Sequence, residues 1–511
     1  MNVVPAPIVI DGESLGLGEF DAVARRGVSC TLALHARAKV MAGQGAVQRA
    51  VEVGDAVYGV NTGFGDLAGV RIADDRLSQL QRRLILSHAS GLGEPLDDEA
   101  VRGMLLLRAN TLSRGYSGVR AQVVEALIAL LDAGVLPLVP SRGSVGASGD
   151  LAPLAHLALP LLGCGQVRID GRTALAAEGL RRAGLAPLAL GPKEGLALIN
   201  GTQAMTSLLA LSCLDARRLV RVADLAAALS TEALRGTDTA FDPRLHALRA
   251  HPGQRVSAAN LWSLMRGSAI RESHRAGDVR VQDPYSVRCA PQVHGAVRDV
   301  LADVEAKVAV EMNAVTDNPL VFPGEGDDGA ILSGGNFHGQ PMAFAADFLA
   351  IALAELASIG ERRIEKLTNT AFSGLPPFLA RDAGLNSGFM MAQVTAAALV
   401  AENKVACHPA SIDSIPTSAD KEDHVSMGMG AALKLRTVVA NVRRVLAIEL
   451  VAAAQGIDLL RPLRSSERLE EAHRLIRERI AFREDDREMA ADLERGIALV
   501  DELDPILDSL D

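Results

Sequence analysis

Aromatic side chains are scarce in this chain of 511 residues, although 49% of its residues are hydrophobic. It contains one Trp, three Tyr and 11 Phe. Ala, Leu and Val must therefore fill most of the core, and such side chains favour closely packed helices. The composition predicts a mainly α-helical protein, and the length allows one large helical unit or two to three domains.

Cysteine is scarce as well. The five cysteines are scattered without a paired spacing: Cys30, Cys164, Cys213, Cys289 and Cys407. This pattern offers neither a disulfide framework nor a zinc site, and it suits a reducing compartment. The acidic stretch 324–329 lacks the ligand spacing of a calcium loop and is interpreted as a hairpin. We expect no metal site.

Positive charge is not in excess, since the formal net charge is −10 and the pI is about 5.6. Such a balance gives no electrostatic footprint for nucleic acid. The N-terminus lacks a basic segment followed by an apolar core, so no secretory signal is expected. Polar residues such as Asn200 and Gln203 interrupt the longest charge-free run, 196–214, which argues against a membrane span. The sequence predicts a cytoplasmic protein that acts on a small molecule.

Helical periodicity extends over much of the chain. The expected helices cover 32–53, 102–131, 157–162, 203–234, 295–315, 340–367, 389–405 and 428–456. Several are apolar on more than one face and must be buried on several sides, which predicts a bundle at the centre of an oligomer. A connection rich in Gly, Arg and Pro at 165–192 predicts an N-terminal domain over 1–193 and a helical bundle over 194–511.

The most informative stretch is the loop Gly-Ser-Val-Gly-Ala-Ser-Gly-Asp at 143–150, followed by Leu-Ala-Pro-Leu-Ala-His. Its glycines permit backbone conformations closed to other residues, and Asp150 is suited to cap the helix that follows. A helix N-terminus can stabilise a developing anion. Taken alone, the loop fits either an ordinary turn between helices or a site with a serine nucleophile.

The same stretch resembles the signature of the aromatic amino acid ammonia-lyases. The resemblance implies that Ala147, Ser148 and Gly149 condense, with loss of two waters, into 4-methylidene-imidazol-5-one, and that no external cofactor is needed. Such a group is an electrophile, which ordinary side chains cannot supply. The family also implies a mainly α-helical fold of the fumarase/aspartase-like superfamily, with a long central bundle, a smaller N-terminal active-site domain and a homotetrameric assembly.

Two motifs before this loop also resemble the family. Tyr58 lies in Tyr-Gly-Val-Asn-Thr-Gly-Phe-Gly, which by itself fits a glycine hinge. The resemblance makes the segment a lid and Tyr58 the catalytic base, a role for which we expect a phenol pKa lowered by its surroundings and by the dipoles of the electrophile. His88 follows an apolar helix, where a structural histidine is common, whereas the resemblance places it against the substrate side chain.

Two further motifs follow the loop. Asn200, in Glu-Gly-Leu-Ala-Leu-Ile-Asn-Gly-Thr, sits where a helix cap is common. The resemblance instead directs it to the prosthetic group and the substrate carboxylate. It also places Gln282, Tyr285 and Arg288 in the pocket, with Tyr285 among the catalytic residues. A guanidinium pairs well with a carboxylate, so Arg288 is the expected carboxylate ligand, although a surface ion pair is its common alternative.

The last two motifs concern the substrate side chain. Phe337, in a glycine-rich turn, is expected to pack on the prosthetic group. Glu422 begins a Glu-Asp-His triplet that also fits an ordinary charged helix start. In histidine-specific members of the family the matching glutamate faces the imidazole, whose N–H groups a carboxylate can accept. In phenylalanine-type members a glutamine stands there.

The motifs together imply deamination of L-histidine to trans-urocanate and ammonia, with a homotetramer as the assembly. Two alternatives stay open. One is a tyrosine or phenylalanine lyase, or an aminomutase, of the same family. The other is a helical assembly protein without activity, against which the intact Ala-Ser-Gly and both motif tyrosines count.

Overall fold

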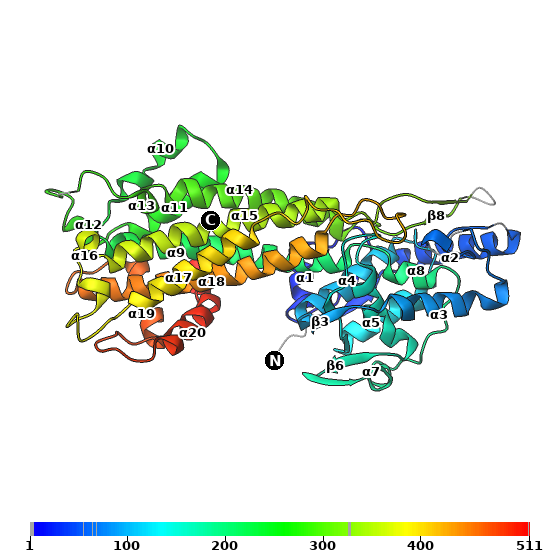
Figure 1. The fold of residues 1–511 in the computed structure, drawn as a ribbon. Helices are drawn as coiled ribbons and strands as arrows, with labels where there is room; N and C mark the ends of the chain where they lie inside the picture. Colours follow the sequence, from blue (N-terminus) through cyan, green and yellow to red (C-terminus); the bar gives the residue numbers. More distant parts are fainter. Residues whose placement is uncertain are drawn as a thin grey trace. The chain divides into compact units, whose positions relative to one another are not determined.

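The computed structural model describes residues 5–54, 56–63, 65–67, 69–278, 280–324, 329–508 and 510. The chain forms two compact units, each built from three separate segments (Figure 1). The first unit comprises Met1–Leu214, Glu305–Asp347 and Pro409–Leu433, and the second comprises Asp215–Val304, Phe348–His408 and Lys434–Asp511. The units are thus interleaved along the chain, whereas the expected division after residue 193 is a single cut. That division stays a prediction.

The first unit packs short helices around the buried helix α4 (Asp98–Ser113), which lies against α1 (Leu17–Ala24) and α5 (Ala121–Asp132). The single helix expected over 102–131 is wrong, because the chain turns between α4 and α5. Gly115 and Gly118 have φ values of 83° and 71° there, and a Cβ on Gly115 would lie 2.5 Å from the Lys39 carbonyl oxygen. The turn therefore depends on glycine.

Other elements of the first unit frame this core. The helices are α2 (Leu34–Val53), α3 (Leu77–His88), α6 (Leu151–Ala158), α7 (Ala176–Arg182) and α8 (Glu194–Ile199). Strand β1 (Ile8–Ile10) pairs parallel with β2 (Cys30–Leu32), and β3 (Leu92–Pro95) pairs antiparallel with β5 (Pro140–Arg142). A three-stranded antiparallel sheet has β6 (Gln166–Ile169) between β4 (Leu136–Pro137) and β7 (Arg172–Leu175). Strands β8 (Leu320–Phe322) and β9 (Ala330–Leu332) form a further antiparallel pair. The last pair confirms a hairpin around 324–329, of which 325–328 lie outside the described residues.

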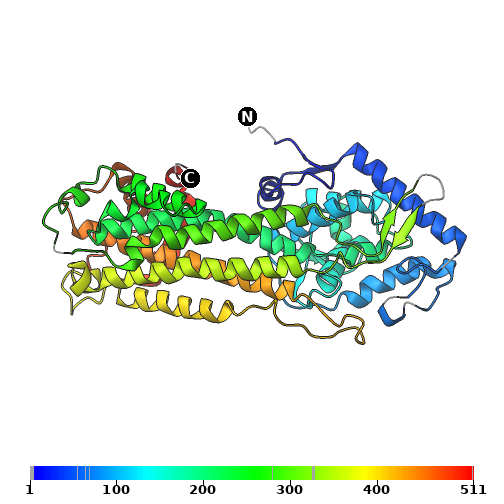
Figure 2. The ribbon, with the colours of Figure 1, turned by 90° about the horizontal axis from the view of Figure 1, so that it is seen from above.

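Five long helices confirm the expected ones: α9 (Gln203–Ala233), α14 (Ala290–Met312), α15 (Gln340–Thr368), α17 (Met390–Ala406) and α18 (Gly428–Leu459). Within the second unit α9, α15 and α18 run side by side (Figures 1 and 2). They meet at buried Glu449 of α18, which accepts hydrogen bonds from Ser230 of α9 at 2.8 Å and from Arg363 Nε of α15 at 2.5 Å. Much of the apolar surface of these helices is buried here, as the pattern predicts, whereas Phe348 and Ile351 of α15 stay exposed.

Shorter helices complete the second unit: α10 (Pro243–Ala247), α11 (Pro252–Met265), α12 (Ala269–Glu272), α13 (Tyr285–Arg288), α16 (Thr370–Ser373), α19 (Glu467–Arg479), α20 (Met489–Leu499) and α21 (Asp504–Leu507). Among the described residues, α15 alone is long and apolar enough to cross a membrane by length and composition. Of its most apolar window, 61% is buried within the structure. The core helices of soluble proteins pass the same test.

Candidate active site

The loop that precedes α6 is folded sharply on itself. Gly146, Ser148 and Gly149 have φ values of 74°, 49° and 74°. A positive φ is a strained conformation for serine, and such strain is concentrated at functional sites. Gly149 forms an isolated parallel bridge with Gly201, and a Cβ on Gly149 would lie 2.1 Å from the Gly201 carbonyl oxygen. The position thus admits only glycine, so the bent Ala-Ser-Gly fits a group that forms by condensation of neighbouring peptide units.

Asp150 ties this loop to the start of α9. Its backbone occupies the N-cap position of α6, but its side chain does not cap that helix, which corrects the expectation. The buried carboxylate instead accepts hydrogen bonds from the amides of Ala204 and Met205 at 3.0 and 2.9 Å. Burial raises the pKa of Asp150 to about 7, while these amides and the Ser144 hydroxyl favour the charged form. The carboxylate thus caps the first turn of α9.

Glu422 lies beside Ser148. The Ser148 hydroxyl donates to Glu422 Oε1 at 3.2 Å, and the Thr417 hydroxyl donates to Oε2 at 2.7 Å. The segment between Thr417 and Glu422 is a tight turn in which residues 418–420 all have positive φ. This turn holds the Glu422 carboxylate at the loop, 274 residues away in sequence. The charged helix start that was the alternative is therefore not what the structure shows.

Tyr58 and His88 belong to the same cluster, because the charge of Glu422 acts on both. Burial raises the pKa of the Tyr58 phenol, the Gly65 amide opposes this through a hydrogen bond, and the negative charge of Glu422 raises it further. The protein surroundings by themselves thus do not lower this pKa, since desolvation outweighs the single hydrogen bond. Phe64 of the same motif lies outside the described residues.

His88 is the last residue of α3 and is partly buried. Burial lowers its pKa, although the Leu84 carbonyl and Glu422 oppose the shift. Nδ1 lies 2.9 Å from the Leu84 carbonyl oxygen. A carbonyl can only accept, so Nδ1 carries the proton and Nε2 of the neutral ring is left as an acceptor. The cluster therefore presents two acceptors, His88 Nε2 and the Glu422 carboxylate.

Asn200 ends α8 and does not cap α9 with its side chain. Its Nδ2 donates to the Asn318 carbonyl oxygen at 3.0 Å and to Asp317 Oδ1 at 3.3 Å. The backbone of the next residue, Gly201, is the partner of Gly149 in the bridge described above. Asn200 is therefore adjacent to the bent loop, as the sequence resemblance implies.

Phe337 is partly buried in the turn before α15. A Cβ on Gly339, two residues later, would lie 2.5 Å from Met205 Sδ and 3.0 Å from the Ser426 hydroxyl. The Met427 amide in turn donates to the Val145 carbonyl at 2.8 Å. The Phe337 turn, the first turn of α9 and the 426–427 segment thus pack together around the bent loop.

Gln282, Tyr285 and Arg288 belong to the second unit. Gln282 and Arg288 line a cavity of about 530 Å³, and the Arg288 guanidinium lies 4.5 Å from the centroid of the Tyr285 ring. The Tyr285 side chain is 71% exposed. These three residues therefore form a group of their own that is separate from the first-unit cluster in sequence and in unit.

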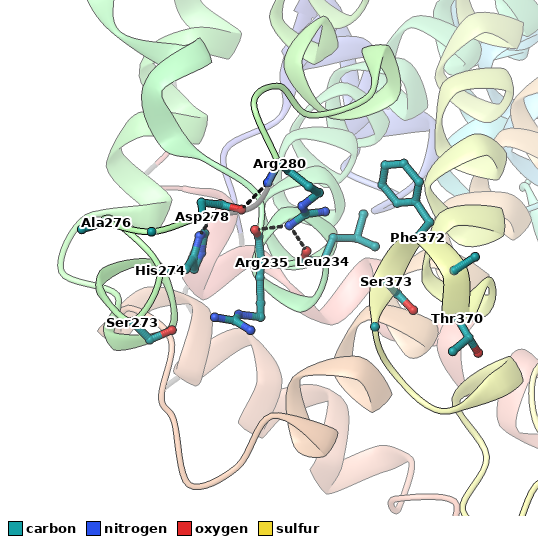
Figure 3. Close-up of a pocket in the computed structure, with 13 residues that line it drawn as sticks. Leu234, Arg235, Ser273, His274, Ala276, Asp278, Arg280, Thr370, Phe372 and Ser373 are labelled. Carbon is teal, nitrogen blue, oxygen red and sulfur yellow. Dashed lines mark hydrogen bonds and ion pairs between the residues drawn. The ribbon is translucent and has the colours of Figure 1, made fainter.

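A neighbouring cavity of about 430 Å³ shows how the segment before Gln282 is held (Figure 3). Arg280 donates to the carbonyl oxygens of Leu234, at 2.6 Å, and Arg235. Its amide donates to Asp278 at 2.9 Å, and Asp278 pairs with His274 at 3.0 Å. Arg280 thus anchors this segment to the end of α9, and sequence reasoning did not single it out.

Sequence reasoning also missed a buried polar group around α8. Lys193 pairs with Asp317 at 2.6 Å with both side chains fully buried, and Gln81 Oε1 accepts from the amides of Gly195 and Leu196. Arg108 donates to the Asn200 carbonyl at 2.8 Å. The charged pair Lys193-Glu194 directly before the apolar Gly-Leu-Ala-Leu-Ile run was an available signal, because charged side chains in such a setting are rarely buried unless they are paired.

Comparisons with known proteins agree with this geometry. The sequence profile described as aromatic amino acid lyase matches residues 15–478. The histidine ammonia-lyase of Anaeromyxobacter sp. (strain K) is 54% identical, over 97% of this chain and 98% of the relative. Among solved structures, the histidine ammonia-lyase from Trypanosoma cruzi is similar with a TM-score of 0.91 and 44% identity, covering 99% of this chain and 96% of that one. The tyrosine aminomutase from Streptomyces globisporus is similar with a TM-score of 0.92 and 37% identity, covering 99% of each chain.

Proposed function

Because the chain belongs to the aromatic amino acid lyase family, we propose that it is a carbon–nitrogen lyase that converts L-histidine to trans-urocanate and ammonia. The observation that carries the substrate assignment is a pair of acceptors: Glu422, which accepts a hydrogen bond from Ser148, and His88 Nε2, on whose ring the charge of Glu422 acts. An imidazole offers N–H groups to such acceptors, and a phenyl ring offers none. The similarity to histidine ammonia-lyases over nearly the whole chain supports the same substrate.

Ala147, Ser148 and Gly149 would form 4-methylidene-imidazol-5-one, and this group supplies the electron sink that the elimination needs. The strained Ser148, the obligatory glycine at 149 and the bridge to Gly201 support this proposal, because they hold the tripeptide bent before any reaction. The proposed reaction requires neither an external cofactor nor a metal ion. Among the described residues, no group of three or more His, Cys, Asp or Glu side chains could hold a metal ion.

Tyr58 is the group that removes the proton from the substrate β-carbon. Its phenol must be deprotonated for this task, and burial and Glu422 both work against deprotonation in the free protein. Substrate binding changes this balance, since an imidazole N–H bound to Glu422 offsets part of the carboxylate's charge. Tyr58 thus becomes a stronger acid when the correct side chain is in place.

The imidazole binds to His88 and Glu422, and Phe337 packs on the face of the prosthetic group. Asn200 contacts the amino acid end of the substrate. Arg288 binds the substrate carboxylate, with Gln282 and Tyr285 beside it and Tyr285 among the catalytic groups. We assign these three residues to a second copy of the chain in a homotetramer. Support comes from the high exposure of Tyr285 and of Val281, which is 96% exposed.

The test is turnover by the purified protein, followed at the absorbance of each conjugated product. We expect rapid formation of urocanate from L-histidine and little product from L-tyrosine or L-phenylalanine. Preferred turnover of L-tyrosine, or formation of a β-amino acid, would instead support the aminomutase alternative that the Streptomyces globisporus structure raises. A cytoplasmic location completes the proposal, and the absence of a paired cysteine spacing supports it.

A further inference from the structure

A buried ion pair stands behind Asn200. Lys193, at the N-cap of α8, has a φ of 65°, and its Nζ lies 2.6 Å from Asp317 Oδ2. Both side chains are 0% exposed. A lysine is rarely buried in this way, and a left-handed backbone adds strain. Neither a buried lysine nor a left-handed backbone is needed to begin a six-residue helix. The Lys193–Asp317 pair therefore serves a purpose other than starting α8.

The second oxygen of Asp317 fixes the orientation of the Asn200 amide. Asp317 Oδ1 accepts from Asn200 Nδ2 at 3.3 Å, and Nδ2 also donates to the Asn318 carbonyl at 3.0 Å. Both partners are acceptors, since one is a backbone carbonyl oxygen and the other is the Asp317 carboxylate that pairs with Lys193. An amide turned over by 180° would place its oxygen against two acceptors. The side-chain nitrogen Nδ2 of Asn200 therefore faces Asp317, and its two N–H groups are donated to Asp317 and to the Asn318 carbonyl.

The side-chain oxygen of Asn200 is consequently the group that is left for a ligand. Oδ1 is buried and has no hydrogen-bond partner in the structure, and Asn200 as a whole is 3% exposed. Arg108 holds the backbone carbonyl of the same residue at 2.8 Å, and Gly201 bridges to Gly149. A buried acceptor without a partner is costly, which indicates that a donor occupies the position during function.

We propose that Lys193 and Asp317 are positioning residues that hold Asn200 with its carbonyl oxygen toward the substrate, where it accepts a hydrogen bond from the substrate amino group. This inference rests on the proposed function, and it changes the expected role of Asn200. An asparagine held in this way cannot donate to the carboxylate, so it recognises the amine that is eliminated. The carboxylate is left to Arg288.

Two partial substrates separate the amine contact from the carboxylate contact. Histamine has the imidazole and the amine but no carboxylate, and 3-(imidazol-4-yl)propionate has the imidazole and the carboxylate but no amine. Their dissociation constants are measured by calorimetry on wild-type and Asn200→Ala protein. We expect histamine to bind at least about tenfold more weakly to the variant, as is typical of a lost hydrogen bond to a charged group. Binding of the propionate should change by less than about twofold.

Asp317→Asn tests the positioning pair itself. An amide at 317 can donate to Asn200 Oδ1 and so allows Asn200 to turn over. We expect the same selective loss of histamine affinity, with propionate binding unchanged or tighter. If this variant folds poorly, Lys193→Met combined with Asp317→Asn removes both charges at nearly constant volume. Intact mass and melting temperature of each variant report on ring formation and folding independently of activity.

Equal weakening of both ligands, selective loss of the propionate, or no change in either would overturn the inference and leave the proposed function standing. A wild-type protein that binds neither ligand and forms no urocanate would contradict the proposed function, and the inference with it.

Discussion

At the scale of single residues, the site depends on what burial does to ionisable groups. His88 is kept neutral and Tyr58 is kept protonated by the same partly buried environment. The charge of Glu422 acts on both, so in the proposed mechanism one carboxylate links recognition of the imidazole with the acidity of Tyr58. The Ser148 hydroxyl holds Glu422 Oε1 only until dehydration removes it. In the proposed reaction, formation of the prosthetic group therefore frees the oxygen that binds the substrate.

Ser148→Ala tests the self-made prosthetic group. The intact mass of the wild-type protein should be lower than the sequence mass by two waters. The variant should lose one of these dehydrations and nearly all activity on L-histidine, because alanine has no hydroxyl to eliminate. Ser144→Ala is a useful control, since Ser144 contacts the same loop and Asp150. An unmodified mass in fully active protein would rule the group out.

Glu422→Gln should move the pH profile of kcat/KM in a defined direction. The carboxylate raises the pKa of Tyr58, so its removal lowers that pKa and the rise of activity with pH should begin at lower pH. At the same time KM for L-histidine should increase about tenfold, because the imidazole N–H then meets a neutral amide oxygen in place of a charged acceptor.

The neighbouring exposed residue provides the matched control, Asp423→Asn. The substrate ionises in the same way with wild type, Glu422→Gln and Asp423→Asn. The effect of Glu422 is therefore read from the difference between the pH profiles of these three proteins. A profile for Glu422→Gln with the same midpoint as the wild type would contradict the coupling.

At the scale of elements, the loop at 143–150 is positioned by the start of α9. The Asp150 carboxylate caps the Ala204 and Met205 amides, and its own amide donates to the Gly201 carbonyl at 2.7 Å. Two peptide segments more than 50 residues apart are thereby fixed to each other. This arrangement holds the Ala-Ser-Gly bend without help from the helix that directly follows it.

Asp150 should make stability depend on pH. Its pKa is about 7 in the folded protein and near 3.8 in an unfolded chain, so the folded state holds a proton between these values that the unfolded state releases. Stability contributed by this group is therefore lost as the pH rises from about 4 to about 7, by on the order of 4 kcal/mol.

Asp150→Asn should remove this dependence, and its melting temperature relative to wild type should be higher at pH 8.5 than at pH 5.5. Asp97→Asn, at an exposed cap of α4, is the control for the amide substitution alone. A constant difference between Asp150→Asn and wild type at the two pH values would show that Asp150 does not carry the proton.

At the scale of the whole molecule, several apolar side chains remain exposed on the single chain. Phe344, Phe348 and Ile351 follow one face of α15 and are 43%, 54% and 45% exposed. Residues spaced four and three apart on a helix form a continuous stripe, which is typical of a surface that another helix covers. The stripe supports the proposed homotetramer.

Mixing subunits tests whether a site draws on more than one copy. Ser148→Ala and Arg288→Ala subunits should each be inactive as pure oligomers. Co-expressed in equal amounts, they should recover about a quarter of wild-type activity if the loop and Arg288 of one site come from different copies. Ser148→Ala mixed with the double variant should stay inactive. Failure of the first mixture to recover activity would place both residues of a site on the same chain.

The sequence by itself determined the long helices, the bend at 147–149 and the identity of the family, because these depend on local composition and on motifs that keep their order. It did not predict the turn at Gly115 and Gly118, the cap that Asp150 provides to α9, the raised pKa of Tyr58 or the Lys193–Asp317 pair. Each of these depends on segments distant in sequence that meet only in the folded chain. The charge and orientation of a side chain depend on its burial and on the position of its partners. The local sequence determines neither burial nor partner position.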